Sequence, residues 1–422
     1  MNSNVNLSIA RVHLLSKKKQ TIVAILGVTF GISMFILMVS FMLGTNEFLQ
    51  DAMLSSTPDI HIYSKIKNTD ISSVTEQYFR ADNNRLVIVH HSKPPRSRKD
   101  LKNSSTIINN IKQNKNVDAV SPVLSAQVFF NYGPAQLNGI IEGVDINEET
   151  QILNISGKMV EGSPANLNKS QDGILMGERL AENLNIHMGE MVTVLTGSGT
   201  IERFHLVGIF QFGLGAVDNT TAIVNIANVQ QLLGKGSDYI TDIHVKLKDI
   251  NNSKKLAVLF TNKYGYAADD WATANASILA TVVARNVMTW VVSIALLVVA
   301  GFGIYNIMNM TIINKLKEIA ILKAQGFNSK DVSVIFLSQS ILIGFVGAVA
   351  GIILGFIFSY IISRLPFPKS DIVSLKYFPV IFELKYYVFG VVFGVLTTFI
   401  AGFIPSLKAS KSDPLAILRN SN

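Results

Sequence analysis

The chain alternates long apolar runs with stretches of mixed polarity, and this pattern predicts four membrane-spanning helices. Ile22–Leu43 contains 22 residues without a charged side chain, and Val287–Met310, Val334–Ile362 and Tyr386–Ile404 are also free of charge. A helix rises about 1.5 Å per residue and a bilayer core is about 30 Å thick, so each run is long enough to cross it. Because no run contains an acid that relays protons or ions, the pattern argues against a secondary transporter.

Residues 45–281 contain no spanning run and instead alternate apolar and polar positions between turn signals. This pattern is typical of a mixed α+β domain, for which we expect two lobes. Trp271–Asn286 has no helix breaker and is expected to continue into the second span. The expected strands are Asp59–Tyr63, Leu86–Val89, Val128–Tyr132, Ile140–Val144, Met191–Leu195, Phe204–Phe210, Ala222–Asn225 and Ile243–Leu247; the expected helices are Ile107–Ile111, Gly177–Leu184, Val229–Leu233 and Lys254–Tyr264.

Glycines recur at helical spacing inside the spans, which favours close approach of neighbouring helices. In the third run Gly344, Gly347, Gly351 and Gly355 fall on one stripe, for which a flexing point is the alternative interpretation. The glycines that we assign to helix packing are Gly27, Gly31, Gly347, Gly351, Gly355, Gly390 and Gly394.

The short charged segment between the second and third runs has two interpretations. Its apolar residues Leu316, Ile319, Ile321 and Leu322 fall near helical spacing, and Gly326 stands where a helix needs a C-terminal stop. The segment is either a solvated loop that returns the chain to the membrane or a helix that docks on a cytoplasmic partner.

Composition and charge support a membrane protein with both termini in the cytoplasm. Hydrophobic residues make up 49% of the 422 positions and charged residues 16%, below the roughly 25% of soluble domains. The net charge of +8 reflects lysines flanking the spans rather than nucleic-acid binding. Residues 1–20 are either an amphipathic surface helix or an unstructured basic tail. The insertion Arg80–Lys102 is either a solvated loop or a contact for anionic lipid headgroups or an acidic partner.

These observations divide the chain into nine segments with a large outer domain after the first span. The segments are an amphipathic N-terminal segment (1–20), span 1 (21–44), the extracytoplasmic, periplasmic α+β domain (45–281), span 2 (282–311), a cytoplasmic connection (312–332), span 3 (333–362), a short outer loop (363–385), span 4 (386–404) and a cytoplasmic tail (405–422).

Several chemistries are absent from the sequence. There is no Gly-x-x-x-x-Gly-Lys-Ser/Thr motif, so an ATPase that drives this protein is a separate polypeptide. There is no cysteine, and no two histidines stand at a His-x-x-x-His spacing, so we expect no catalytic residue and no metal site.

Two motifs resemble those of ABC-transporter permeases of the FtsX/MacB/lipoprotein-release superfamily. Lys315–Gly326 is similar to the coupling helix of that family, and Pro405–Arg419 is similar to its closing pattern. The resemblance implies that the connection 312–332 contacts the ATPase, which binds ATP and Mg²⁺ itself. It implies polar contacts by Glu318 and Lys323, apolar anchors at Ile319 and Leu322, and support from Leu316, Gly326 and Phe327.

Three outer segments resemble the LolC/LolE-like lipoprotein-release branch in particular, namely Glu142–Asp145, Gly173–Leu184 and Phe204–Gly213. The sequence departs from that branch at Thr196–Arg203, where the subunit that recruits the periplasmic carrier has a long hairpin and this chain has a tight turn. This departure puts carrier recruitment by this chain in doubt. The insertion Arg80–Lys102 is a second departure.

The resemblance implies mechanotransmission by two permease copies, or by two related permeases, with two ATPase subunits and membrane lipid as partners. The expected work is the release of lipidated proteins from the inner membrane. The alternatives are MacB-like efflux of small toxic compounds or peptides with a periplasmic adaptor, and regulation of a cell-wall hydrolase, which the large outer domain disfavours. The implied substrate cleft between the first two spans comprises Met38, Phe41, Met42, Val287, Trp290, Val291 and Ile294.

Overall fold

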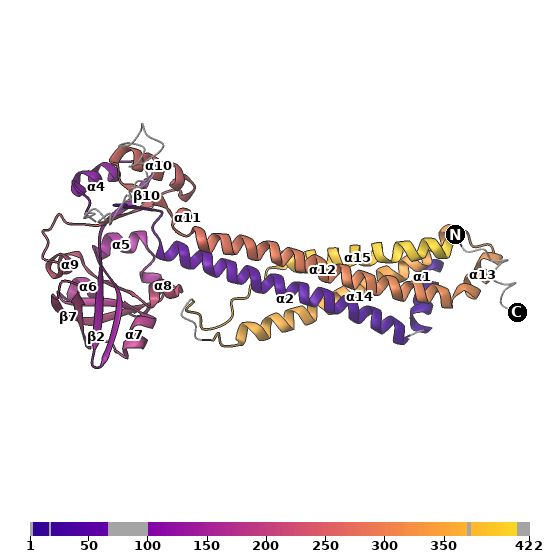
Figure 1. Cartoon of the computed structure of the whole chain (residues 1–422). Helices are drawn as coiled ribbons and strands as arrows, with labels where there is room; N and C mark the ends of the chain where they lie inside the picture. The colour runs from indigo at the N-terminus through magenta and orange to yellow at the C-terminus, as the bar shows by residue number, and fades with distance from the viewer. Residues whose placement is uncertain (1–2, 17, 66–99, 369–372, 412–422) are drawn as a thin grey trace, which may run out of the picture. The chain divides into compact units, whose positions relative to one another are not determined.

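The computed structural model describes residues 3–16, 18–65, 100–368 and 373–411, which form two compact units (Figure 1). The helical unit comprises Met1–Phe48, Ala280–Phe367 and Lys376–Asn422, and the strand-rich unit comprises Leu49–Leu279 and Pro368–Leu375. The expected strand Leu86–Val89 and all of the basic insertion before Asp100 lie outside the described residues, as does the tail from 412 onward.

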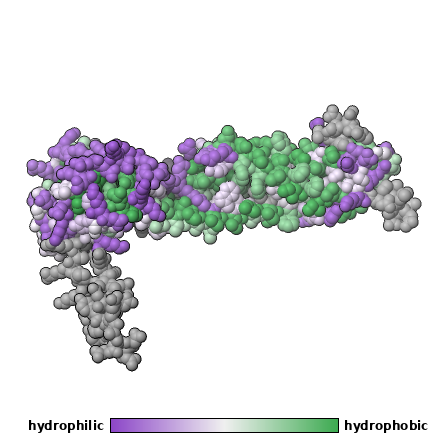
Figure 2. Space-filling view, turned by 90° about the horizontal axis from the view of Figure 1, so that it is seen from above, coloured by the Kyte–Doolittle hydropathy of each residue, from purple (hydrophilic) through white to green (hydrophobic). Residues whose placement is uncertain are grey.

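Four helices in the described residues are long and apolar enough to cross a membrane, judged by length and composition. Each contains one of the four predicted runs and extends beyond it. Figure 2 shows the hydrophobic surface that they share. The helices of this part of the chain are α1 (Ser3–Ser16), α2 (Lys18–Ser56), α12 (Ala276–Asn314), α13 (Leu316–Ala324), α14 (Ser329–Arg364) and α15 (Leu384–Ser410).

The start of α12 differs from the prediction of one continuous helix from Trp271. The chain forms a short helix, α11 (Trp271–Ala274), and α12 begins only at Ala276. Between them, the Asn275 side-chain amide donates to the Trp271 carbonyl at 2.9 Å and to Thr57 Oγ1 at 3.2 Å. An asparagine that bonds to nearby backbone competes with helical hydrogen bonding, which explains the break.

The strand-rich unit holds one ten-stranded sheet, part of which closes on itself. Hydrogen bonds link β2, β3, β8, β5, β7 and β6 in succession, and β6 pairs back with β2, so that six strands form a ring. The strands are β1 (Ile60–Tyr63), β2 (Val117–Tyr132), β3 (Ala135–Val144), β4 (Met159–Gly162), β5 (Gly173–Gly177), β6 (Met191–Thr196), β7 (Ile201–Phe210), β8 (Thr221–Asn225), β9 (Asp242–Leu247) and β10 (Ala267–Asp270).

Alternating side chains from all six ring strands pack into one core. Phe130, Ile141, Met176, Val194 and Leu206 are among its fully buried members. The inward positions of a strand are separated by two residues, and this spacing is why the pattern of alternation predicted strands here. The predicted tight turn is confirmed, because β6 ends at Thr196 and β7 begins at Ile201.

The long strand β2 also belongs to a second group of strands, in the order β10-β1-β9-β2. A separate core, which includes Ile62, Val245 and Phe260, covers one face of this group. The two expected lobes do not separate as compact units, because β2 belongs to both groups. The helices of the strand-rich unit are α4 (Ser104–Lys112), α5 (Ile146–Ile152), α6 (Asn166–Lys169), α7 (Glu178–Leu184), α8 (Gly215–Asp218), α9 (Ile226–Leu232), α10 (Ser253–Tyr264) and α11, with 3-10 turns at Ser156–Lys158 and Ile250–Asn252.

The connection between α14 and α15 contains no helix among its described residues. Its residues Pro368–Leu375 group with the strand-rich unit. There, Val373 forms an antiparallel bridge with Leu214, and the Ser374 amide donates to the Gly213 carbonyl at 3.1 Å. The turn that receives them is held by the buried Asp218, whose carboxylate accepts from the amides of Phe212 and Gly213 at 2.8 and 2.9 Å.

Candidate functional site

The candidate site is the end of the helical unit formed by α1, α13 and the adjoining ends of α14 and α15. α13 is a separate short helix with a defined end, since Gly326 adopts a φ of +96° and the Phe327 amide donates back to the Leu322 carbonyl at 3.2 Å. α14 begins two residues after Phe327, and its first turn is closed by a capping box between Asn328 and Asp331. The segment is therefore a helix with a defined C-terminal end and not an extended loop.

The two apolar faces of α13 have different surroundings. Ile319 is 1% exposed and belongs to the core of the helical unit, and Ala320 is fully buried. Leu322 is half-buried, whereas Ile321 is 49% exposed. The expectation that Ile319 anchors a partner is therefore wrong, because this side chain already packs inside its own chain. Ile321 is the large aliphatic residue of α13 that is left exposed.

Glu318 and Lys323 of α13, and Lys315 directly before it, also bind within the chain. Lys315, only 8% exposed, donates to both carboxylate oxygens of Glu318 at 2.7 and 2.6 Å. Lys323 donates to the Ser410 carbonyl at the end of α15 at 2.7 Å. Glu318 remains exposed over 49% of its side chain, so it can still meet a partner, while Lys323 is partly occupied by its own chain.

His13 of α1 completes this network and was not singled out from the sequence. Its Nε2 lies 3.4 Å from Glu318 Oε2, and its Nδ1 lies 3.1 Å from the Gln339 amide nitrogen of α14. An amide nitrogen only donates, so Nδ1 accepts and Nε2 carries the proton toward Glu318. Burial, with Lys315 nearby, lowers the pKa of His13 against the opposing effect of Glu318. A neutral histidine thus joins three helices.

Of the two interpretations of residues 1–20, the structure has the helix, because Ser3–Ser16 forms α1. The side chain of Ala10 is fully buried, and the His13 ring stands 6.3 Å from the ring of Phe336. α1 therefore packs on α14 through both apolar and polar contacts. An unstructured basic tail would not form these contacts.

Most of the glycines assigned to packing lie directly against another helix. A β-carbon on Gly347, Gly351 or Gly355 would come within 2.6–3.0 Å of Val28, Ile32 or Ile36 of α2, respectively, and one on Gly394 would come within 2.3 Å of Ile32. A β-carbon on Gly390 would lie 3.5 Å from Phe35, and one on Gly31 would lie 3.1 Å from Ala300 of α12. Gly27 differs, because it is exposed and no atom of this chain lies within 4 Å of its β-carbon position.

The seven residues of the expected cleft do not share one environment. Met38, Phe41 and Met42 of α2 are half-buried, whereas the four residues of α12 are exposed, from Trp290 at 49% to Val291 at 61%. The rest of the α12 set is Val287 and Ile294, exposed at 58% and 50%. Trp290 meets α15 edge-on, with 6.0 Å between its ring centroid and that of Phe389.

A hollow among the long helices lies elsewhere, between α14 and α15. It measures about 390 Å³ and is lined almost entirely by apolar side chains. Its lining residues are Ile352, Phe356, Phe382, Leu384, Tyr387, Val388 and Val391.

Two family models match the chain. Residues 21–261 match the MacB-like periplasmic core domain, and residues 290–414 match the FtsX-like permease C-terminal domain. The chain is therefore a membrane permease of the ABC-transporter class. It belongs to the family that combines a MacB-like periplasmic core domain with an FtsX-like permease segment.

Curated relatives fall in the same superfamily. The chain is 24% identical to the lipoprotein-releasing system transmembrane protein LolC of Neisseria meningitidis serogroup B, over 94% of both chains. It is 22% identical to the lipoprotein-releasing system transmembrane protein LolE of Haemophilus influenzae, over 81% of this chain and 79% of the relative. It is also 22% identical to the macrolide export ATP-binding/permease protein MacB 2 of Yersinia pestis, over 72% of this chain and 44% of that protein.

Proposed function

We propose that this permease couples ATP hydrolysis by a separate ATPase to the release of lipoproteins from the outer face of a bacterial inner membrane. The observation that carries the proposal is the match to LolC over 94% of both chains, with both family models in the same order. In this proposal both termini and α13 are cytoplasmic, and the strand-rich unit is periplasmic.

The geometry of α13 supports its role as the ATPase contact. It is a short helix that exposes Lys317, Glu318 and Ile321 on one side, while Ile319 and Ala320 are buried on the other side. A force applied to Ile321 or Glu318 reaches α1 and α14 through the Glu318–His13–Gln339 chain of contacts. ATP and Mg²⁺ are bound by the ATPase in this scheme.

The partner permease is a second copy or a related chain, because four helices are too few to enclose a path by themselves. The exposed apolar face of α12, which includes Val287, Val291 and Ile294, is the surface that we assign to lipid, substrate acyl chains or this second permease. The compact β6–β7 turn supports a subunit that does not itself recruit a carrier.

A second candidate function is export of small compounds or peptides, and it is favoured by the similarity to the macrolide export protein over 72% of this chain. The two functions differ in the cargo and in the periplasmic partner. Regulation of a cell-wall hydrolase remains a third hypothesis, and it predicts a hydrolase among the bound proteins.

Co-purification tests these alternatives together. The tagged full-length chain is purified in mild detergent from its own host, and bound proteins and lipids are identified by mass spectrometry. We expect an ABC ATPase and triacylated or diacylated lipoproteins. An adaptor with an outer-membrane channel would support export, and a hydrolase would support regulation. Absence of any ATPase would contradict all three coupled mechanisms.

A further inference from the structure

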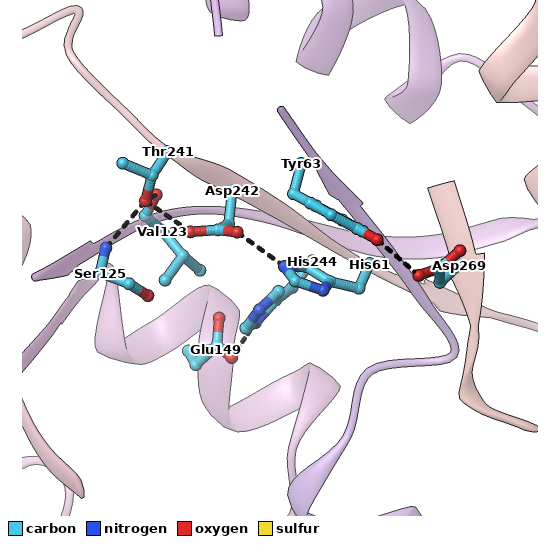
Figure 3. A network of polar contacts seen from close by, with 9 residues as sticks. All are labelled: His61, Tyr63, Val123, Ser125, Glu149, Thr241, Asp242, His244 and Asp269. Atoms are coloured by element: carbon cyan, nitrogen blue, oxygen red, sulfur yellow. Dashed lines mark hydrogen bonds and ion pairs between the residues drawn. The ribbon is translucent and has the colours of Figure 1, made fainter. Parts of the chain in front are cut away.

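One face of the strands β1, β9 and β10 is polar and partly buried (Figure 3). Ile60 and Ile62 of β1 point into the apolar core, so the alternate residues Asp59, His61 and Tyr63 point to the opposite face. Each of these three has a partner on a neighbouring strand. The charged and titratable groups on this face come from several elements. They are Asp59, directly before β1; His61 and Tyr63 of β1; Asp242, His244 and Lys246 of β9; Asp269 of β10; Glu142 of β3; and Glu149 of α5.

The centre of the face is a chain of four side chains. His61 Nε2 lies 2.7 Å from Asp242 Oδ1, and His244 Nδ1 lies 2.8 Å from Glu149 Oε1. The two imidazole rings meet edge-on at 5.4 Å, because His61 and His244 are directly opposite in the β1–β9 ladder. Glu149 is 1% exposed and His244 is 8% exposed, so the second pair is buried.

Burial of this pair carries a cost that apolar residues would avoid, so a role beyond packing is worth testing. Glu149 Oε2 is buried and has no hydrogen-bond partner among the described residues, which leaves an acceptor open inside the cluster. Nearby, Lys246 and the Leu247 amide bind the carboxylate of Asp59 at 3.3 and 2.8 Å.

The position of the cluster in the chain is specific. β1 begins at Ile60, separated by three residues from Ser56, where α2 ends, and β10 ends at Asp270, directly before α11 and α12. The two strands are paired with each other, and β1 is also paired with β9. A displacement of α2 therefore acts first on β1, and a displacement of α12 acts first on β10. Glu149 lies on α5, which contacts β2 and β9, so the His244–Glu149 pair connects these strands to an element outside them.

We propose that His61, Asp242, His244 and Glu149 form a mechanical link that transmits movement of β1 and β10 to α5. These four side chains are called the joint below, and the joint is rigid while His244 is protonated. The proposal makes His244 and Glu149 positioning residues, and its transmission part rests on the proposed function. The joint takes up this proton from the compartment that surrounds the strand-rich unit.

The direction of the pH dependence follows from the partners. Burial opposes the charge on His244, but Glu149, Glu142 and Asp242 outweigh it and raise the pKa of His244 to about 9. Burial raises the pKa of Glu142 to about 7, with His244 opposing and Glu149 assisting. Burial also opposes ionisation of Asp242, yet the His61 hydrogen bond keeps its pKa below the ordinary value.

Groups whose pKa is raised by folding stabilise the fold fully below their unfolded pKa, and the stabilisation is lost as the pH rises through the folded value. The stabilisation that Glu142 contributes is therefore lost as the pH rises to about 7, and the stabilisation that His244 contributes is lost as the pH rises to about 9. Asp242 acts in the opposite direction at strongly acid pH. We expect the joint to be most rigid in weakly acid conditions and loosest near pH 9.

The first test uses the full-length chain in detergent and needs no transport partner. Hydrogen–deuterium exchange of peptides covering β1 and α5 is measured at pH 6 and pH 9, with correction for intrinsic exchange rates. We expect protection at pH 9 to fall at least about tenfold, a change that corresponds to one power of ten in the opening equilibrium. His244→Gln and Glu149→Gln should reduce this pH dependence to the part that Glu142 contributes.

Further variants test whether the pH dependence belongs to this cluster. Glu142→Gln imitates the protonated acid, so it should fold and should retain wild-type protection at pH 6. The matched control is the exposed pair His187 and Glu190, 3.5 Å apart, at which the Gln substitutions should change nothing. Equal wild-type protection at both pH values, or wild-type pH dependence in a folded His244→Gln variant, would overturn the joint.

The second test addresses transmission in the complex with the co-purified ATPase. Addition of ATP should change exchange in both β1 and α5 in the wild type, but only in β1 in His244→Gln. Equal changes in α5 in both proteins would overturn transmission through the pair, and so would an unchanged α5 in the wild type. If no ATPase co-purifies, the proposed function fails, and the pH test decides the proton-dependent joint by itself.

Discussion

Gly351 of α14 faces Ile32 of α2 so closely that a β-carbon on the glycine would lie 2.8 Å from the Cβ of Ile32. Real β-carbon contacts of this length are essentially not found, so the two helices can keep this separation only while residue 351 lacks a side chain. The neighbours Gly347 and Gly355 stand in the same relation to Val28 and Ile36. These three glycines, spaced four residues apart on α14, thus set the distance between α14 and α2.

The first prediction follows from this contact. Gly351→Leu should destabilise the helical unit by about 1–3 kcal/mol, the usual cost of overpacking, and should lower the thermal midpoint measured by fluorescence-detected gel filtration in detergent. Gly27→Leu is the control, because nothing lies within 4 Å of that position. Equal midpoints for the two variants would show that α14 and α2 do not depend on this contact.

The second prediction separates docking from folding in α13. Ile321→Asp should leave the yield and thermal midpoint of the chain unchanged but reduce bound ATPase in pull-down, because a charge then faces an apolar groove. Loss of one aliphatic contact is worth roughly 1.5–3 kcal/mol, about one to two powers of ten in affinity. Ile319→Asp should instead destabilise the chain itself, since Ile319 is buried. Full ATPase binding by Ile321→Asp would contradict docking through this side chain.

The third prediction concerns the His13 link between α1 and α14. Because the pKa of His13 is lowered in the fold, its contribution to stability is complete above its ordinary value of 6.5 and is lost as the pH falls through the lower, folded value. We expect α1 to become sensitive to limited proteolysis below about pH 6, the acid side of an ordinary histidine. His13→Gln keeps a neutral hydrogen-bonding side chain and should abolish this acid sensitivity. An unchanged acid response in His13→Gln would assign it to another group.

The fourth prediction is topological and uses the absence of native cysteine. In intact cells, Ser329→Cys at the start of α14 should be protected from an impermeant thiol reagent, and Ser163→Cys in the strand-rich unit should react. Both should react after the membrane is opened. Labelling of the 329 variant from outside would overturn the four-span arrangement.

The fifth prediction concerns the turn between β6 and β7. Deleting Gly197–Gly199 should leave the set of co-purified proteins unchanged, because the turn projects only a few residues beyond the paired positions Leu195 and Ile201. Ile321→Asp serves as the comparison in which a partner is lost. Loss of a periplasmic carrier on deletion would assign recruitment to this turn.

The sequence by itself determined the features that depend on neighbouring residues. Uncharged runs of 19 to 29 residues specify the spans, and four-residue spacing places Gly347, Gly351 and Gly355 on one stripe. Gly326 marks the end of α13 because a left-handed residue terminates a helix locally. The short β6–β7 connection is likewise visible in the number of residues between two strands.

The tertiary structure alone decided which apolar face of α13 is buried. Ile319 and Ile321 are both aliphatic residues of one amphipathic segment, and only the packing of the helical unit's core makes the first interior and the second exposed. Helical spacing groups residues on faces but carries no information on what covers each face. The same limit hid His13, whose partners Glu318 and Gln339 are more than 300 positions away along the chain.

The polar joint and the ring of strands show this limit most clearly. His244 and Glu149 are separated by 95 positions, and they meet because β9 lies beside β2 and α5 packs on both. The ring closes because β6 pairs with both β7 and β2. Strand pairing and burial depend on contacts between distant segments, so alternation along the sequence predicts the strands but not their neighbours.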